Sequence, residues 1–226
     1  MTFRNRLQYF LVKRLQISNK KALELISVGA CRVASKQVFE NVEIQPFEEI
    51  ICEGEILREE KKLYYIAFYK PVGIETTLNQ AIPDNLQAIL PFEEKLFPVG
   101  RLDKASEGLL LLTNDGRVFD KTLRKEHQTE KEYIVKVDKP ITASFIQQMS
   151  KGITIMGQTT LPCFVEAIDE YNFRIILVQG LNRQIRRMCY KLDYEVLSLK
   201  RIRIGQVHLE DLQPNEYREF GELIGE

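Results

Sequence analysis

The amino-acid sequence predicts an α+β protein with a small N-terminal domain and a larger C-terminal domain. In the first 30 residues, apolar residues recur at helical spacing and are followed by short strand-like runs, whereas from residue 63 onward strand-like runs and helical segments are interleaved. Residues 53–62 are polar and lack periodicity, which predicts a linker. We therefore expect two domains, at residues 1–52 and 63–226.

The N-terminal domain is expected to contain two helices and a small set of strands. The apolar spacing predicts an amphipathic helix over 4–16. Ser18 is a suitable N-cap for a second helix, which Gly29 would end. Residues 31–39 alternate as a strand and turn do, and residues 42–51 supply more strand.

The C-terminal domain is expected to hold a sheet with helices packed against it. Strand-like runs occur at 63–69, 109–112, 131–139, 163–168, 172–178 and 196–205. Helices are predicted at 86–91, 115–123, 142–152, 182–192 and 215–224. Asp115, Thr142 and Asn182 are the expected caps of three of these helices.

The run of four leucines at 109–112 is the centre of this pattern. It is bounded by Gly108 and by a turn signal at 114–116, and a short apolar run of this kind predicts a strand that is buried on both faces. The charged residues that precede it are therefore expected in a loop or at a strand end beside the core.

Asp103 in that segment is the candidate for chemistry. Arg101 and Lys104 flank it and would favour the charged form of the carboxylate. A carboxylate held in its ionised form suits a nucleophile or an electrostatic stabiliser and is a poor general acid.

The formal net charge is zero, but the charges are segregated along the chain. Basic residues are concentrated in 1–40 and 181–205, whereas 41–60 and 206–226 are acidic. Segregated basic blocks can form a local surface that attracts phosphate. In the expected helix at 182–192, a basic first turn is unfavourable toward the helix dipole, so a carboxylate or phosphate nearby would stabilise it.

Several classes of protein are not supported by the sequence. No apolar run approaches the roughly 20 residues of a membrane span, and the first residues lack the apolar core of a signal peptide. The four cysteines are scattered, as expected for reduced thiols in a cytoplasmic protein. The two histidines stand alone, and no glycine-rich phosphate loop is present, so we expect neither a metal site nor a cofactor.

Four stretches resemble the RsuA-type pseudouridine synthase family. The stretch 100–116 closely resembles the family's catalytic motif, and 70–73 resembles the Lys-Pro-x-Gly segment that precedes it. The stretches 130–142 and 178–189 resemble its second and third motifs and are most similar to the RluF branch. Residues 1–50 resemble the S4 RNA-binding module, with Ser-Asn-Lys-Lys where that module usually has Ser-Arg-Arg. Lysine keeps a point charge for phosphate but loses the bidentate fork of arginine.

The resemblance implies an S4-like RNA-binding domain followed by a pseudouridine synthase domain with a mainly antiparallel mixed sheet flanked by helices. It implies isomerisation of uridine to pseudouridine in ribosomal RNA, in the large subunit for the RluF branch, without a cofactor. Asp103 would be the nucleophile, Tyr133 would stack on the target uracil and accept its proton, and Arg186 would contact Asp103. The implied RNA-binding residues are Arg101, Leu102, Lys104, Arg183, Gln184, Ile185, Arg187, Lys200, Arg201 and Arg203 and, in the first domain, Arg6, Lys20 and Lys21.

Other interpretations of the sequence stay open. The target could be a uridine of small-subunit ribosomal RNA or of tRNA, or the chain could bind RNA without catalysis. A hydrolase with a carboxylate nucleophile would need a second carboxylate, for which Glu107 is the only near candidate in the sequence. A single RNA-binding module favours a monomer.

Overall fold

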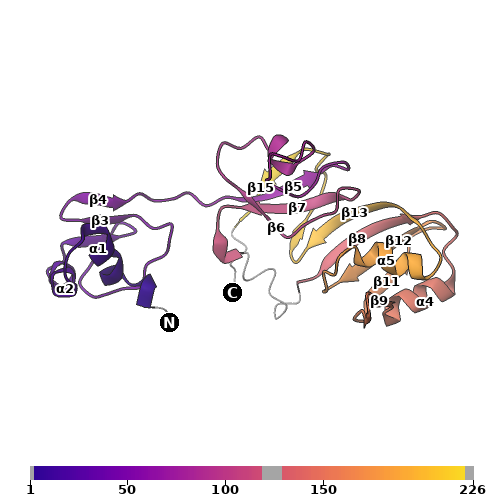
Figure 1. Ribbon diagram of the computed structural model, residues 1–226, viewed down its shortest axis with the longest axis horizontal. Coiled ribbons are helices and arrows are strands. Elements are labelled where there is room, and N and C mark those ends of the chain that lie inside the picture. Colours follow the sequence, from indigo (N-terminus) through magenta and orange to yellow (C-terminus); the bar gives the residue numbers. More distant parts are fainter. Residues whose placement is uncertain (1–2, 119–128, 222–226) are drawn as a thin grey trace. The chain divides into compact units, whose positions relative to one another are not determined.

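The computed structural model describes residues 3–118 and 129–221 and divides into two compact units, Met1–Leu63 and Tyr64–Glu226 (Figure 1). None of the helices within these described ranges has the length and apolarity that crossing a bilayer requires. Each unit has its own hydrophobic core.

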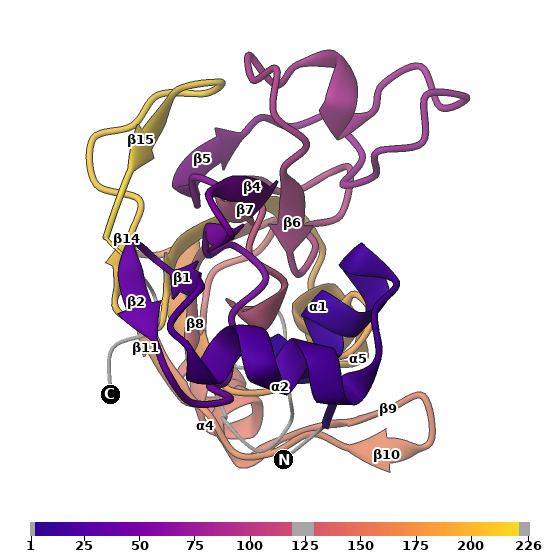
Figure 2. The same ribbon diagram turned by 90° about the vertical axis from the view of Figure 1, so that its left-hand side faces the viewer.

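The first unit packs two helices on a four-stranded antiparallel sheet. Its elements are η1 (Phe3–Asn5), α1 (Leu7–Leu15), α2 (Asn19–Ser27), β1 (Cys31–Val33), β2 (Lys36–Val38), β3 (Ile50–Cys52) and β4 (Glu55–Arg58), with strand order β2-β1-β3-β4. The two helices lie side by side (Figure 2), and Leu7, Leu11 and Ile26 are buried between them and the sheet. The predicted cap is confirmed, because the Ser18 hydroxyl accepts a hydrogen bond from the N–H of Lys21 (3.2 Å).

Two segments of this unit differ from the sequence prediction. Residues 55–58, expected in the linker, form β4 because Glu53 and Gly54 both adopt positive φ and make a tight hairpin turn. Of the strand expected at 42–51, only residues 50 and 51 are in a strand, as part of β3. The preceding segment is held instead by the Arg58 side chain, which donates to the carbonyl of Glu48 (2.7 Å).

The second unit is built on a nine-stranded mixed sheet. The main path runs β11-β12-β8-β13-β7-β5-β15, with β14 beside β13 and β6 beside β7. The strands are β5 (Tyr65–Lys70), β6 (Phe97–Val99), β7 (Glu107–Thr113), β8 (Lys131–Val137), β11 (Phe164–Ala167), β12 (Asn172–Leu177), β13 (Val196–Ile204), β14 (Val207–His208) and β15 (Tyr217–Glu219). A separate hairpin is formed by β9 (Thr154–Ile155) and β10 (Gln158–Thr159). The pairings are antiparallel except that of β7 with β13, so the predicted α+β fold is confirmed.

Helices α4 (Ala143–Lys151) and α5 (Gln184–Lys191) lie beside β8, β11 and β12 (Figure 1). They share one core with the sheet, in which Phe145 and Met188 meet Phe173 and Val135. The predicted cap of α4 is confirmed, because the Thr142 hydroxyl accepts from the N–H of residue 145 (3.1 Å). A second cluster buries Leu110 and Leu112 of β7 against β5 and the short 3-10 helix η2 (Leu86–Ala88).

Three predictions for this unit need correction or lie outside the described residues. The helix predicted at 215–224 is wrong, because residues 217–219 form β15 on the edge of β5, where Tyr217 packs against Phe92 (ring centroids 4.6 Å apart). Covering an exposed strand edge outweighs the local helical pattern. The helix expected at 86–91 is limited to the turn η2. Most of the helix expected after Asp115 lies outside the described residues.

The junction of β7 with β13 joins the two antiparallel halves of the sheet. Only two residue pairs make this parallel contact, and one of them pairs Gly108 with Arg201. Gly108 has φ +101°, and a Cβ there would lie 2.3 Å from the carbonyl oxygen of Arg201. The junction therefore requires glycine at this position.

The first prediction tests this junction. Gly108→Ala should lower the free energy of unfolding by roughly 3 kcal/mol, the sum of a positive-φ penalty and a clash with backbone that cannot move aside. The measurement is urea denaturation followed by circular dichroism.

Gly157→Ala is the matched control, because Gly157 also has positive φ (78°) but nothing lies within 4 Å of the point that a Cβ would occupy. It should cost only about 1 kcal/mol. Equal losses for the two variants would contradict the role given to the close approach.

Candidate active site

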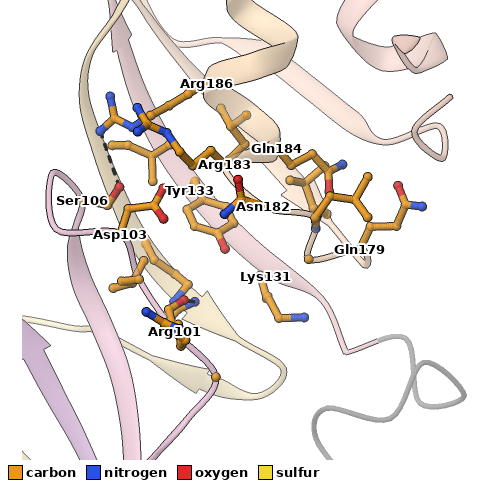
Figure 3. A pocket seen from close by; sticks show the side chains of 18 of the residues that line it. Arg101, Asp103, Ser106, Lys131, Tyr133, Gln179, Asn182, Arg183, Gln184 and Arg186 are labelled. Atoms are coloured by element: carbon orange, nitrogen blue, oxygen red, sulfur yellow. Dashed lines mark hydrogen bonds between the residues drawn. The ribbon is translucent and has the colours of Figure 1, made fainter. Parts of the chain in front are cut away.

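The second unit contains a cavity of about 1070 Å³, and Arg201 at the junction of β7 and β13 is among the residues that line it. Its walls come from the loop before β7, from β8, from the segment that leads into α5 and from β13 (Figure 3). The basic residues that line it are Arg101, Lys104, Lys131, Arg183, Arg186 and Arg201. Among the described residues of the lining, Glu75 and Asp103 are the acidic ones. A cavity with this excess of positive charge is suited to a polyanion.

The backbone of the Asp103 loop is held by uncharged groups on one side. The Thr76 hydroxyl donates to the carbonyl of Leu102 (2.7 Å) and accepts from the N–H of the same residue (3.2 Å). The N–H of Gly73 donates to the carbonyl of Lys104 (2.8 Å). Both donors come from the segment that follows β5, so this segment fixes the loop.

Two arginines hold the ends of the same loop. Arg186 donates to the carbonyl of Ala105 (2.8 Å). Arg201 donates to the carbonyls of Arg101 (3.4 Å) and Leu109 (2.7 Å), before and after the loop. Arg201 is only 2 % exposed, so its charge is committed to this position and not to solvent.

The carbonyl of Asp103 itself accepts from the N–H of Ser106 (3.0 Å). All five carbonyls from residue 101 to residue 105 are therefore hydrogen-bonded. The Asp103 residue is nevertheless exposed, and its carboxylate points into the cavity beside the Tyr133 ring (Figure 3). A fixed backbone with a free carboxylate is a pre-organised arrangement for attack on a bound group.

The cations next to Asp103 in the sequence pair elsewhere. Lys104 forms an ion pair with Asp84 (2.8 Å), which raises the pKa of Lys104, and Arg101 approaches Glu75 (3.9 Å). Within residues 3–118 and 129–221, neither makes an ion pair with Asp103. The basic groups around this carboxylate come instead from other elements of the sheet and from α5.

Arg186 lies next to Asp103 without forming an ion pair with it in the described part of the chain. Its guanidinium donates to the carbonyls of Val196 (3.0 Å) and Ala105 and lies 3.5 Å from the Ser106 hydroxyl. Burial lowers the pKa of Arg186 and nearby Arg183 adds to this, whereas the negative charge of Asp103 opposes both effects. Arg186 thus interacts with Asp103 through charge, while its hydrogen bonds to residues 105 and 106 support the loop.

Tyr133 is half-buried in β8, directly between Ile175 of β12 and Arg201 of β13. No hydrogen bond to its hydroxyl is found among the residues that the structure describes. Lys131 lies two positions earlier on the same face of the strand and also lines the cavity. The Lys131 ammonium donates to the carbonyl of Thr129 (3.0 Å), and burial followed by the charge of Arg201 lowers its pKa.

Helix α5 begins one residue later than predicted. Its N-cap is Arg183, which has φ 50° and no capping side chain, so the prediction of Asn182 as N-cap is wrong. The carbonyl of Asn182 accepts from Arg187 Nε (3.0 Å), and the Asn182 side chain accepts from Arg187 Nη2 (3.2 Å). Asn182 therefore accepts hydrogen bonds from the Arg187 side chain and does not cap the first N–H groups of α5.

Most of the residues chosen from the sequence meet in the cavity. The lining includes Arg101, Leu102, Asp103, Lys104, Tyr133, Arg183, Gln184, Ile185, Arg186 and Arg201. Arg187, Lys200 and Arg203 do not line it. Arg203 is paired with Glu132 (2.7 Å) and Glu130 (2.9 Å), so its charge is neutralised within the sheet.

The remaining predicted RNA-binding residues lie in the first unit. Lys20 and Lys21 are exposed, and Lys21 lies 3.3 Å from Glu24. Arg6 is half-buried and donates to the carbonyl of Asn41 (2.9 Å), which assigns it a structural contact.

Sequence reasoning missed Lys131 and the role of Thr76 in holding the loop. The spacing of Lys131 from Tyr133 could have revealed it, because residues two apart in a strand face the same way. The Thr76 contact spans 26 residues and has no local signature. In the described ranges, no group of three His, Cys, Asp or Glu residues could hold a metal ion.

Comparison with known proteins identifies the family. Residues 64–191 match the family model described as RNA pseudouridylate synthase. The chain is 42 % identical to the dual-specificity RNA pseudouridine synthase RluF of Escherichia coli, over 90 % of this chain and 71 % of that protein. It is 30 % identical to the ribosomal small subunit pseudouridine synthase A of Pasteurella multocida, over 94 % of each chain.

A solved crystal structure of a pseudouridylate synthase is similar over 96 % of both chains, with a TM-score of 0.66 and 28 % sequence identity. The chain belongs to the RNA pseudouridylate synthase family and is an enzyme that isomerises uridine in RNA. The family and the enzyme class predicted from the sequence are confirmed.

The second prediction tests the hydrogen bonds by which Thr76 fixes the Asp103 loop. Thr76→Val removes one hydroxyl that makes two buried hydrogen bonds and should cost about 2 kcal/mol of stability, because the polar groups of Leu102 are left unpaired. Misplacement of the loop should also lower kcat roughly tenfold or more. Thermal unfolding measures the change in stability, and the rate of pseudouridine formation per enzyme molecule measures the change in kcat.

Thr77→Val is the matched control, because the hydrogen bond that the Thr77 hydroxyl accepts from the N–H of Asn79 (3.2 Å) is exposed to solvent. It should leave stability and turnover close to those of the parent protein. A Thr76→Val enzyme with unchanged kcat would show that the loop does not need this anchor.

Proposed function

We propose that this enzyme converts a uridine of large-subunit ribosomal RNA to pseudouridine, with Asp103 as its nucleophile. The observation that carries the proposal is the exposed carboxylate of Asp103 on a loop whose carbonyls are all hydrogen-bonded, within a basic cavity. The hydrolase interpretation is less well supported, because Glu107, its second carboxylate, accepts a hydrogen bond from the Tyr69 hydroxyl (2.8 Å) and does not line the cavity.

The reaction breaks the N1–C1′ glycosidic bond, turns the uracil and rejoins it to the ribose through C5. The target nucleotide must leave its stack, which costs roughly a few kcal/mol and less in a loop or bulge. Asp103 attacks either C1′ or the uracil ring. Arg186 orients the carboxylate from α5, and the negative charge of Asp103 favours the charged form of this guanidinium.

Tyr133 stacks on the uracil and accepts the C5 proton after the base has rejoined. Its ring beside Asp103 supports this role, as does a hydroxyl with no partner in the described ranges (Figure 3). Arg101, Lys104 and Arg183 bind backbone phosphates or occupy the space that the flipped base leaves. No step of this scheme calls for a cofactor.

The choice of ribosomal RNA rests on sequence similarity. The motifs resemble the RluF branch, and identity to the RluF relative (42 %) exceeds identity to the small-subunit synthase (30 %). The relative's name describes it as dual-specific, so a second RNA, such as tRNA, belongs in any test. The S4-like residues 1–52 assist RNA binding, and the enzyme acts as a monomer in the cytoplasm.

The test is incubation with transcripts of both ribosomal RNAs, with tRNA and with assembled subunits, followed by carbodiimide modification and primer extension. A stop in large-subunit RNA supports the proposal. A stop confined to small-subunit RNA or tRNA would reassign the substrate, and the absence of a stop in every RNA would favour a protein that binds RNA without catalysis.

The third prediction concerns Asp103. Asp103→Asn should reduce turnover below detection while folding and RNA affinity are retained, because the amide is close in shape and is not a nucleophile. Primer extension, circular dichroism and filter binding measure the three properties. Asp193→Asn, at an exposed aspartate outside the cavity, is the control and should keep full activity. Turnover by Asp103→Asn would refute the assignment.

The fourth prediction separates the two roles of Tyr133. Tyr133→Phe keeps the ring for stacking and removes the hydroxyl, so RNA affinity should persist while kcat falls by roughly a hundredfold or more. Tyr171→Phe, at an exposed tyrosine outside the cavity, serves as control. A Tyr133→Phe enzyme with parental kcat would remove the hydroxyl from the mechanism and leave Tyr133 only a stacking role.

A further inference from the structure

Two side-chain amides line the cavity away from Asp103. Gln179 follows β12, and Asn182 lies in the segment that leads into α5. Figure 3 shows Asp103 and Gln179 on opposite sides of the labelled lining, with Asn182 between them. Gln179 is half-buried and Asn182 is exposed, so a ligand in the cavity can reach both amides. Neither has a role in the proposed isomerisation.

This part of the cavity is polar but uncharged. Among the lining residues between 158 and 182 that the structure describes, none has a charged side chain. The cations of the lining come from other segments, as does Asp103. Phosphate contacts position a nucleic acid, whereas hydrogen bonds to base edges read its sequence. Because an uncharged amide gains less from a phosphate than a cation does, this part of the cavity is better suited to a base.

The cavity has room for more than the target uridine. Its volume of about 1070 Å³ exceeds the range of roughly 300–1,000 Å³ that is typical of pockets for a drug-sized molecule. Gln179 lies four residues after Ile175, the cross-strand partner of Tyr133, and four residues of chain span at most about 14 Å. If Tyr133 stacks on the flipped uracil, the amides lie within reach of a neighbouring nucleotide.

The oxygen of each amide already has a partner. The N–H of Leu161 donates to Gln179 Oε1 (2.8 Å), and Arg187 Nη2 donates to Asn182 Oδ1 (3.2 Å). A backbone N–H and a guanidinium can only donate, so each must face the oxygen of the amide, and this determines which way both amides point. The two NH2 groups are left as donors, and neither has a hydrogen-bond partner within residues 3–118 and 129–221.

We propose that Gln179 and Asn182 are specificity-determining residues, whose NH2 groups donate to a base beside the target uridine that offers two adjacent acceptors. The inference rests on the proposed function. Two bases have such an edge: guanine with O6 and N7, and cytosine with O2 and N3. Adenine has an amino donor where guanine has O6, and uracil has an N–H where cytosine has the acceptor N3, so the anchored donors oppose both.

A purely structural role leaves half of each amide unexplained. Leu161 and Arg187 need only an acceptor, which a carboxylate supplies at least as well as an amide. Gln179→Glu and Asn182→Asp therefore keep the anchoring oxygen and exchange the NH2 donor for a second acceptor. An anchoring role predicts that these variants behave as the parent enzyme does, whereas a role in reading a base predicts a changed preference.

The fifth prediction is this change of preference. The probe is the shortest transcript that the parent enzyme modifies, made with each of the four bases at the positions that neighbour the target uridine, and with a compensating change where such a base is paired. At one position the parent should prefer guanine over adenine, or cytosine over uracil, by roughly tenfold or more in kcat/KM. Gln179→Glu and Asn182→Asp should lose or reverse this preference, because an acceptor then faces an acceptor.

The charge that both substitutions add is controlled separately. In Asn182→Asp the new charge lies beside Arg187, which offsets it. Gln147→Glu adds the same charge at an exposed glutamine of α4 outside the cavity, and it should keep the rate and the base preference of the parent. Repulsion of RNA by charge alone lowers kcat/KM for every transcript by the same factor, so the ratio between bases reports the contact.

The outcomes separate this inference from the proposed function. An active parent enzyme that modifies all the transcripts equally well would overturn the inference alone. Variants that keep the parent's preference, or that lose the same factor on every transcript, would also overturn it and leave the amides as anchors. The two variants are measured singly, so if one fails to fold the other decides. A parent enzyme that modifies no RNA would overturn the proposed function and this inference with it.

Discussion

The contact between Gly108 and Arg201 is the constraint on which the second unit depends. Two residue pairs form the parallel junction between β7 and β13, and the backbones approach there so closely that no side chain fits. The same junction brings the guanidinium of Arg201 to the carbonyls at both ends of the Asp103 loop. The contact that joins the two halves of the sheet therefore also places the arginine that holds the loop, and neither half of the sheet carries a complete site alone.

The placement of charge around this junction favours function over stability. Lys70 and Arg201 are both buried, and Arg201 Nη2 has no hydrogen-bond partner in the described residues. The carboxylate nearest to them in the loop is directed outward into the cavity. An arrangement selected for stability alone would pair these charges or replace them with apolar side chains. Here the surplus positive charge is held in a rigid sheet, where it does not have to reorganise when a negatively charged substrate arrives.

Local patterns in the sequence were enough to predict the strands and helices whose partners are near. Ser18 and Thr142 cap helices as expected, and the buried leucine run of β7 follows from its flanking turn signals. The errors occur where a distant partner decides. Tyr217 lies in a strand because the edge of β5 needs covering. Residues 55–58 form a strand because the positive φ of Gly54 closes a hairpin that polarity alone does not reveal.

The site, too, has features that local sequence predicts and features that depend on distant partners. Asp103, Tyr133 and Arg186 lie in recognisable stretches of sequence, so their gathering could be predicted. The hydrogen bond from Thr76 to Leu102 and the pairing of Gly108 with Lys70 on one side and Arg201 on the other depend on register between strands far apart in the chain. A rigid loop cannot follow its target, so on the proposed mechanism the nucleotide must come to the carboxylate. Unstacking the nucleotide costs roughly a few kcal/mol. Contacts between its phosphates and the cations that line the cavity can offset this cost.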